Sequence, residues 1–315
     1  MFINPLQGKT DLDPCQRSNF HTHVGTGRNT CGHHTFEELL PWYQYLGYGC
    51  LCLSNHNCVT DLEPLRKEYD MVFIPGYEYT YNMHMVSRGS DRVVLKGEMS
   101  EEEGYQKAID SCLADGGVPV VCHPNWPEEW HVTKDFLNSI HGYYGMEIVN
   151  ASVDRGPIRS RNERPNGRSN ASNVYDWTLS KENRIIWCFG HDDFHRWCHF
   201  GIAWNMIFAD KEQGAILDAI KKGCFYVSTG LVLEYLDLKD DRLSIKVRNS
   251  DGLYEDYYYR FIGRHGETLK TVYDLEASYV IRGNEGYVRV EVVNSAGKQL
   301  YTQPVYDDQV YTLPG

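Results

Sequence analysis

Residues 19–25 read NFHTHVG, a strand-like run that ends in two histidines separated by one residue. Side chains at positions i and i+2 of a β-strand share one face, so His21 and His23 can bind one ion together. Further strand-like runs follow along the chain, and several of them also end in His, Glu or Asp. The strand-like runs indicate the fold, and the polar residues at their ends indicate where a functional site lies.

Strand-like and helix-like segments alternate over the first two thirds of the chain. The strand-like segments are rich in β-branched and aromatic residues, and several helix-like segments begin with a Ser or Thr that can cap the helix. The expected strands are 19–24, 49–54, 71–77, 117–122, 145–150, 184–189 and 203–208, with a further short strand opening at His84. The expected helices are 35–46, 60–69, 100–114, 133–141, 171–182 and 211–222. This alternation predicts a parallel sheet, either closed as a β/α barrel or open and doubly wound.

The pattern changes after Gly230. From there apolar and polar residues alternate between Gly, Asn and Asp turns, which is typical of antiparallel strands. We therefore expect two domains: an α/β domain over residues 1–229, and a small antiparallel, β-sandwich-like domain over residues 230–315. Because no flexible Gly/Ser linker separates them, the second domain is expected to pack against the first.

The composition narrows the range of partners. A net charge of -12 over 315 residues repels polyanions, so no nucleic-acid polymer is expected. No apolar run approaches the roughly 18 residues that a membrane helix needs, and the first residues lack the pattern of a secretion signal. We expect a cytoplasmic protein without a membrane partner, with its ten cysteines reduced. The sequence leaves the oligomeric state open.

Eight His, Glu and Asp residues lie at or near the ends of the expected strands. The carboxyl ends of parallel strands meet in one mouth, where barrel enzymes build their active sites. Imidazole nitrogens and carboxylate oxygens are donors that zinc, manganese and iron accept. The set comprises His21, His23, His56, Glu78, His84, His123, Asp193 and His195. Each residue alone is more often structural, but together they predict a metal site.

The order of these motifs resembles the PHP family, the polymerase and histidinol phosphatase domains. The matching pieces are NFHTHVG, LSNHN, IPGYEYT, His84, CHPNWP and GHDDFH, and they span roughly residues 15–229. The segment AILDAIKKGCFYVSTG and the β-like tail resemble the branch with a C-terminal β domain. The resemblance implies a distorted seven-stranded β/α (TIM-like) barrel that holds two or three divalent metal ions, with zinc, manganese and iron as candidates.

The resemblance also implies how the ligands are divided. One ion would be held by His21, His23, Glu78 and Asp193, and its neighbour by Glu78, His84 and His123. A third ion would use His56 and His195.

Two positions depart from the family pattern. Cys31 stands where an Asp or His often completes the third site, which makes Cys31 a possible further ligand. A thiolate there would favour zinc. Asn55 precedes His56 where the family commonly has Asp, and an amide cannot raise imidazole basicity as a carboxylate does.

The implied activity is that of a metal-dependent phosphoesterase. Two metal ions about 3.5–4 Å apart can share a water and convert it to hydroxide near neutral pH. The substrate would be a small phosphorylated molecule of the nucleotide or sugar phosphate class, attacked by a metal-bridging hydroxide. Asp193 and His195 are the expected catalytic residues. The leaving group also needs a proton, for which the candidates are His195, His191 and Asp192.

An arginine-rich stretch, RGPIRSRNERPNGR, follows the strand expected to end at residue 150. Guanidinium groups bind phosphate oxygens in pairs, so this stretch is a candidate phosphate clamp, although a solvated surface loop is an equal alternative. Its arginines are Arg155, Arg159, Arg161, Arg164 and Arg168. Trp126 and Trp130 either line the same mouth or serve as ordinary packing residues.

Two other functions stay open. The same metal ions would also suit a carboxylic ester or amide hydrolase, because a carbonyl needs the same activation. Alternatively, the chain is a non-enzymatic binding protein on a degenerate barrel. The nearly complete ligand set counts against degeneracy, and the arginine-rich stretch favours phosphate.

Overall fold

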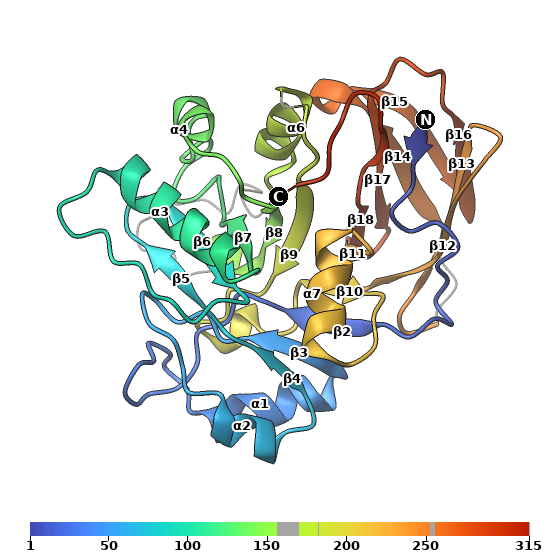
Figure 1. Ribbon diagram of the computed structural model, residues 1–315. Helices are drawn as coiled ribbons and strands as arrows, with labels where there is room; N and C mark the ends of the chain where they lie inside the picture. The colour runs from blue at the N-terminus through green and yellow to red at the C-terminus, as the bar shows by residue number, and fades with distance from the viewer. Residues whose placement is uncertain (156–169, 182, 253–255, 315) are drawn as a thin grey trace, which may run out of the picture.

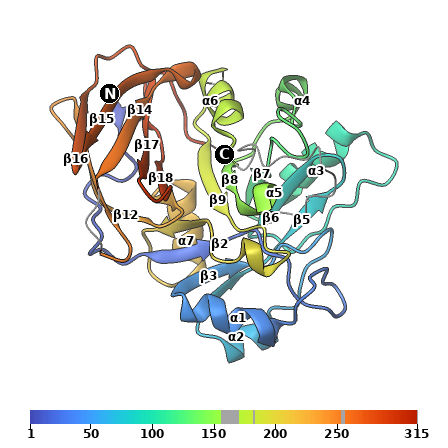
Figure 2. The same cartoon turned by 180° about the vertical axis from the view of Figure 1, so that it is seen from behind.

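The computed structural model describes residues 1–155, 170–181, 183–252 and 256–314. The described residues form three β-sheets with helices packed against them (Figure 1). Seen from the front and from behind, the orange and red C-terminal strands lie on one side of the molecule, opposite the cyan strands of residues 76–80 and 84–88 (Figure 2).

The largest sheet has 11 strands and combines both ends of the chain. Its strands are β1 (Phe2–Ile3), β2 (Gln16–Asn19), β3 (Tyr48–Cys52), β4 (Val72–Ile74), β10 (Trp204–Ile207), β11 (Phe225–Ser228), β14 (Tyr257–Ile262), β15 (Thr268–Asp274), β17 (Tyr287–Asn294), β18 (Gln299–Thr302) and β19 (Val305–Asp307). The order is β1-β19-β17-β18-β11-β10-β2-β3-β4, with β14 beside β17 and β15 beside β14. Only the β2–β3 and β3–β4 pairs of this sheet are parallel.

The second sheet has five strands in chain order and carries much of the site. They are β5 (Gly76–Thr80), β6 (His84–Arg88), β7 (Val118–Val121), β8 (Gly145–Asn150) and β9 (Trp187–His191). The β5–β6 and β6–β7 pairs are antiparallel, whereas β7–β8 and β8–β9 are parallel. Only three residues connect β5 to β6, and so short a connection can join only antiparallel neighbours.

The third sheet is antiparallel and consists of β12 (Leu231–Lys239), β13 (Arg242–Asn249) and β16 (Glu276–Val280). Its apolar side packs against the C-terminal strands of the 11-stranded sheet, where residues such as Leu233 and Ile245 share one core with Tyr259 and Val290. The division into domains at residues 229 and 230 stays a prediction. Hydrogen bonds between β11 and β18 join the two sides of that boundary.

The helices follow the expected pattern closely. They are α1 (Phe36–Tyr45), α2 (Glu63–Glu68), α3 (Glu101–Ala114), α4 (Lys134–Ser139), α5 (Ala151–Arg155), α6 (Ser172–Lys181) and α7 (Gln213–Lys221). Six of them lie within three residues of an expected helix, and these six expectations are confirmed. Thr35 and Ser100 begin α1 and α3 with reciprocal capping boxes, in which side chains bond the free N–H groups of the first turn.

The expected seven-stranded β/α barrel is wrong, because the described strands form three mixed or antiparallel sheets and no closed barrel. The expected strand 71–77 is divided at Pro75 into β4 and β5, which belong to different sheets. Proline lacks the N–H that a continuous ladder needs. β10 is antiparallel to both of its neighbours, which also rules out an all-parallel open sheet. Isolated bridges, Thr22 with Phe194 and His56 with Glu78, connect the sheets.

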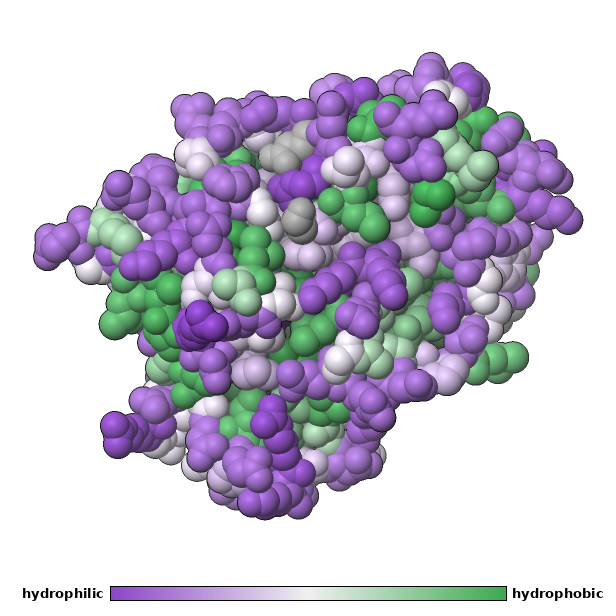
Figure 3. Space-filling model, viewed as in Figure 1, coloured by the Kyte–Doolittle hydropathy of each residue, from purple (hydrophilic) through white to green (hydrophobic). Residues whose placement is uncertain are grey.

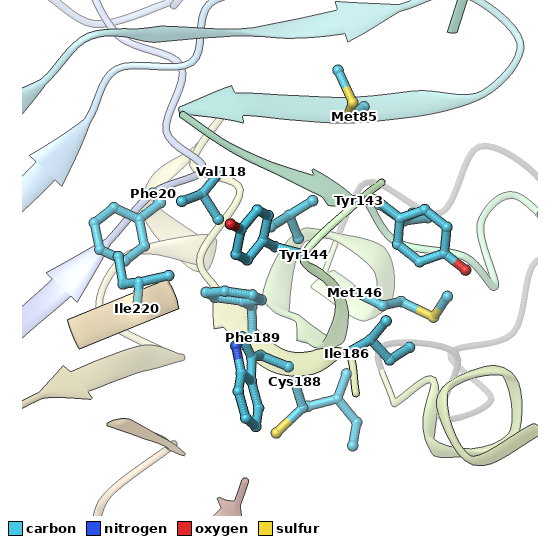
Figure 4. Close-up of a cluster of buried hydrophobic side chains, with 14 of the residues drawn as sticks. Phe20, Met85, Val118, Tyr143, Tyr144, Met146, Ile186, Cys188, Phe189 and Ile220 are labelled. Atoms are coloured by element: carbon cyan, nitrogen blue, oxygen red, sulfur yellow. The ribbon is translucent and has the colours of Figure 1, made fainter. Parts of the chain in front are cut away.

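A large apolar core supports the second sheet. Phe20, Met146, Phe189 and Ile220 are fully buried in it (Figure 4). The front face of the molecule is mostly hydrophilic, with hydrophobic residues between the polar ones (Figure 3). In the described parts of the chain, we find no helix with the length and apolar character that crossing a membrane requires.

Candidate metal centre

The structure brings all eight predicted ligands together around Glu78 in β5. Five histidine nitrogens lie within 3.5 Å of its carboxylate oxygens, those of His21, His23, His56, His84 and His123. Asp193 Oδ1 lies 3.3 Å from His21 Nε2 and 3.2 Å from His23 Nε2. His195 joins through its Nδ1, 3.2 Å from Asp193 Oδ1. The residues lie in or shortly after six different strands, β2, β3, β5, β6, β7 and β9, so the fold assembles the cluster.

Several overlapping groups in this cluster could hold a metal ion, because their donor atoms lie within 4.8 Å of one another. These groups are His21, His23 and Glu78; Glu78, His84 and His123; His21, His123 and Asp193; and His23, His56 and His195. Glu78 belongs to two groups and therefore lies between two possible ion positions. The group of Glu78, His84 and His123 is the set that the resemblance implies for one ion, whereas the group of His21, His123 and Asp193 combines residues from two of the implied sets.

Four polar atoms at the centre of the cluster have no hydrogen-bond partner. They are His21 Nε2, His23 Nε2, Glu78 Oε2 and Asp193 Oδ1, all buried. Buried polar atoms are nearly always paired, and leaving four unpaired in one place is costly. Nitrogen and carboxylate donors that face one another without hydrogen bonds are the arrangement that a divalent cation satisfies. The residues present therefore fit a metal site.

The protonation states of the clustered residues also fit a metal site. Burial opposes ionisation of Glu78 and Asp193, yet the neighbouring imidazoles, His21 first among them, hold the pKa of each carboxyl well below its usual range. Burial and the nearby His195 lower the pKa of His23 to about 3, so this ring is neutral and able to bind a metal. Ionised carboxylates beside a neutral imidazole form the donor set that divalent metals require.

Two of the ligand candidates have unusual backbone conformations. His123 has φ +23° and Asp193 has φ +46°, both in the left-handed region. Non-glycine residues seldom occupy this region, and they do so where the surrounding structure demands it, often at functional sites. Both residues follow a strand, and the turn brings His123 to Glu78 and Asp193 to His21 and His23.

Glu147 in β8 belongs to the site and was missed from the sequence. Its Oε1 accepts hydrogen bonds of 2.7 Å from Nδ1 of both His21 and His191, and its Oε2 accepts one from the backbone N–H of His123. Asn150 donates to both Glu147 and Asp193. The available signal was a carboxylate in the apolar strand GMEIVN, because charged residues are seldom buried unless they are paired.

Cys31 lies next to the group formed by His23, His56 and His195. Its Sγ is 3.4 Å from His23 Nδ1 and accepts the backbone N–H of His56 at 3.1 Å. Asn55 supports this loop: its Oδ1 accepts from the backbone N–H of Cys31, and its Nδ2 donates to Val24 O. The amide at position 55 thus shapes the loop that carries Cys31.

The structure distinguishes the three candidate proton donors. His191 is fully buried, with Nδ1 bonded to Glu147. Asp192 is fully buried as well, and its oxygens accept the N–H groups of residues 201–203 and the hydroxyl of Tyr43. The His195 side chain is 29% exposed. Only His195 of these three can exchange protons with a substrate or solvent directly.

The open side of the cluster is defined by partly exposed imidazoles. His56 is 36% and His84 is 13% exposed, whereas His21 and His23 are fully buried. A substrate would therefore reach the cluster from the side of His56, His84 and His195.

The predicted phosphate clamp cannot be placed. Arg159, Arg161, Arg164 and Arg168 lie outside the described residues. Arg155 ends the short helix α5, so the segment after β8 begins with a helix where a turn-rich loop was expected.

No protein-family model matches the chain, and no curated protein matches it either.

Proposed function

We propose that this chain is a metal-dependent phosphoesterase of the PHP type that acts on a small phosphorylated molecule. Two or three divalent ions, chosen from zinc, manganese and iron, would be bound by the eight clustered residues. The observation that carries the proposal is the set of four buried, unpartnered atoms on His21, His23, Glu78 and Asp193. The order of the sequence motifs supports the same activity.

The proposed ligand sets share residues. His21, His23, Glu78 and Asp193 would hold one ion, and Glu78, His84 and His123 the next. His56 and His195 would serve a third, with Cys31 beside them. When bound, divalent ions lower the pKa of water and neutralise charge on the oxygens of a phosphoryl group.

The protein's own residues orient this site and handle protons. Glu147 accepts the Nδ1 hydrogen of His21 and so turns Nε2 toward Glu78 and Asp193, where a bound metal ion would replace a proton on that nitrogen. Asp193 lies against His195 and raises the pKa of that imidazole, although burial opposes the shift. When only two ions are bound, a protonated His195 at the open side is placed to donate to the leaving oxygen of a substrate. A third ion on His195 would take the place of that proton and neutralise the charge on the oxygen instead.

Metal analysis combined with a substrate screen tests the proposal. Purified full-length chain would be loaded with zinc, manganese or iron(II) and assayed against phosphomonoesters, phosphodiesters, carboxylic esters and amides. We expect bound metal and turnover of a phosphate ester, both lost in His21→Ala, Glu78→Ala and Asp193→Ala. The exposed Glu102→Gln variant serves as the control and should behave as the unmodified protein.

Three results would contradict the proposal. Protein that binds no metal after reconstitution would remove its basis. Turnover of carboxylic esters or amides alone would replace the phosphoesterase with the second hydrolase class. Bound metal without turnover of any ester or amide would favour a non-enzymatic binding protein.

A further inference from the structure

A half-exposed tryptophan borders the candidate metal centre. The ring centroid of Trp126 lies 5.3 Å from that of His123 and 5.8 Å from that of His84. Both histidines contact the Glu78 carboxylate. Trp126 is nevertheless 42% exposed, so a large apolar ring lies on the open side of a polar cluster.

The neighbouring Trp130 has a different environment. Its ring packs edge-on against Trp177, with centroids 5.7 Å apart, and Lys134 Nζ lies 4.9 Å from its centroid. Trp130 therefore contributes to packing. For Trp126, the ring contacts found among the described residues are those with the two histidines, and much of its surface stays accessible to a ligand.

The loop that carries Trp126 is held in place by hydrogen bonds. Asn125 is buried, and its Nδ2 donates to Asn170 O and to Asn173 Oδ1. Its Oδ1 accepts the backbone N–H of Trp130. Trp126 itself donates its backbone N–H to His123 O at 2.9 Å. A ring positioned before the ligand arrives binds at a smaller cost in conformational entropy.

We propose that Trp126 selects substrates whose leaving group carries a planar aromatic ring, which stacks on the indole while the phosphate lies at the metal centre. This inference rests on the proposed phosphoesterase function. In an aryl phosphate, the aromatic ring is bonded to the ester oxygen and so lies close to the phosphorus. The position of Trp126 beside two ligand histidines matches that arrangement, and indole rings stack on aromatic ligands regardless of their substituents.

The test compares two substrates in two variants. The metal-loaded chain would be assayed with phenyl phosphate and with glycerol phosphate, which lacks an aromatic ring. Trp126→Leu should raise KM for phenyl phosphate about tenfold or more, as expected for loss of one stacked ring, and leave KM for glycerol phosphate unchanged. Trp126→Phe should restore most of the preference. The control is Trp197→Leu, another half-exposed tryptophan, which stands beside His34 and Phe194.

The possible outcomes separate this inference from the proposed function. If both phosphates are hydrolysed and Trp126→Leu changes their KM values equally or not at all, the inference is wrong and the phosphoesterase stands. If neither is hydrolysed although metal is bound, the wider screen of phosphate esters decides the proposed function. The inference then depends on phenyl phosphate binding measured by calorimetry: a tenfold weaker affinity in Trp126→Leu supports it, and an equal affinity overturns it.

Discussion

Glu147 Oε1 accepts a 2.7 Å hydrogen bond from Nδ1 of His21, whose other ring nitrogen lies 3.4 Å from Glu78 and 3.3 Å from Asp193. A carboxylate in this position fixes the tautomer and the orientation of a metal-binding imidazole. Because the same oxygen also binds His191, one buried side chain holds two histidines, one that follows β2 of the 11-stranded sheet and one that ends β9 of the five-stranded sheet.

Replacing Glu147 with Gln should weaken metal binding about 10- to 100-fold, the usual effect of removing such a supporting carboxylate. The amide keeps the volume of the side chain but accepts hydrogen bonds more weakly. Competition titration with a chromogenic chelator measures the affinity, and Glu102→Gln is the exposed control. An unchanged affinity in Glu147→Gln would show that His21 is oriented by packing alone.

Removing bound metal should lower the thermal stability of the chain. A ligand that binds only the folded state stabilises it by about 2.7 kcal/mol when its concentration is 100 times its Kd. We therefore expect the melting temperature to fall by several degrees after chelation and to recover on addition of zinc. His23→Ala should show a smaller response. Equal melting curves with and without metal would argue against a bound ion.

Arg88 in β6 should tolerate replacement by Met without loss of stability. The side chain is fully buried, and its Nε, Nη1 and Nη2 atoms have no hydrogen-bond partner. The guanidinium lies between two apolar rings, 4.7 Å from the centroid of Phe20 and 4.4 Å from that of Phe189 (both shown in Figure 4). Burial lowers its pKa to about 10, so it stays charged at neutral pH, with aromatic rings in place of hydrogen-bond acceptors.

Met has a similar length and needs no hydrogen bonds, and hydrophobic replacement of buried charges is often neutral or stabilising by about 1–4 kcal/mol. Urea unfolding of the metal-loaded protein measures the change. A destabilisation of several kcal/mol would mean that Arg88 has a stabilising partner within the protein.

Unlike Arg88, Arg289 in β17 should be needed for the stability of the protein. Its Nε and Nη2 donate to the two carboxylate oxygens of Asp176 in α6, at 2.7 and 2.6 Å, and both residues are buried. Removing one partner of a buried pair typically costs about 3–5 kcal/mol, so Arg289→Ala should be strongly destabilising. Arg260→Ala removes a half-exposed arginine that bonds Glu291 and should cost less than about 1 kcal/mol. Equal losses in the two variants would contradict this assignment.

The stabilising contribution of Glu291 should be lost as the pH falls into the acid range. Burial opposes its ionisation, but the guanidinium groups of Arg289 and Arg260 lower its pKa from 4.5 to about 2. In the native state it stays ionised at pH values where the unfolded chain takes up a proton. Its contribution, on the order of 3 kcal/mol, is therefore complete above about pH 5 and is lost as the pH falls toward 2. The free energy of unfolding should depend less on pH in this range in Glu291→Gln.

Much of the local structure could be predicted from residue patterns. Helices such as α3 and α6 begin and end close to the expected positions, because caps and apolar periodicity act over a few neighbouring residues. The eight ligand candidates could also be identified, because polar residues at the ends of apolar strands are a local signal. Their metal-binding role stays a prediction, whereas their convergence around Glu78 is a property of the structure.

Only the tertiary structure decided which strands pair and which residues support the site. The expected strand 71–77 joins two sheets through β4 and β5, and β10 runs antiparallel to β2. Glu147 became part of the site only when β8 and β9 placed it beside His21 and His191. Strand pairing and buried hydrogen bonds depend on residues far apart in the chain, so the amino-acid pattern determined the segments and their polar ends, and their arrangement in space required the folded protein.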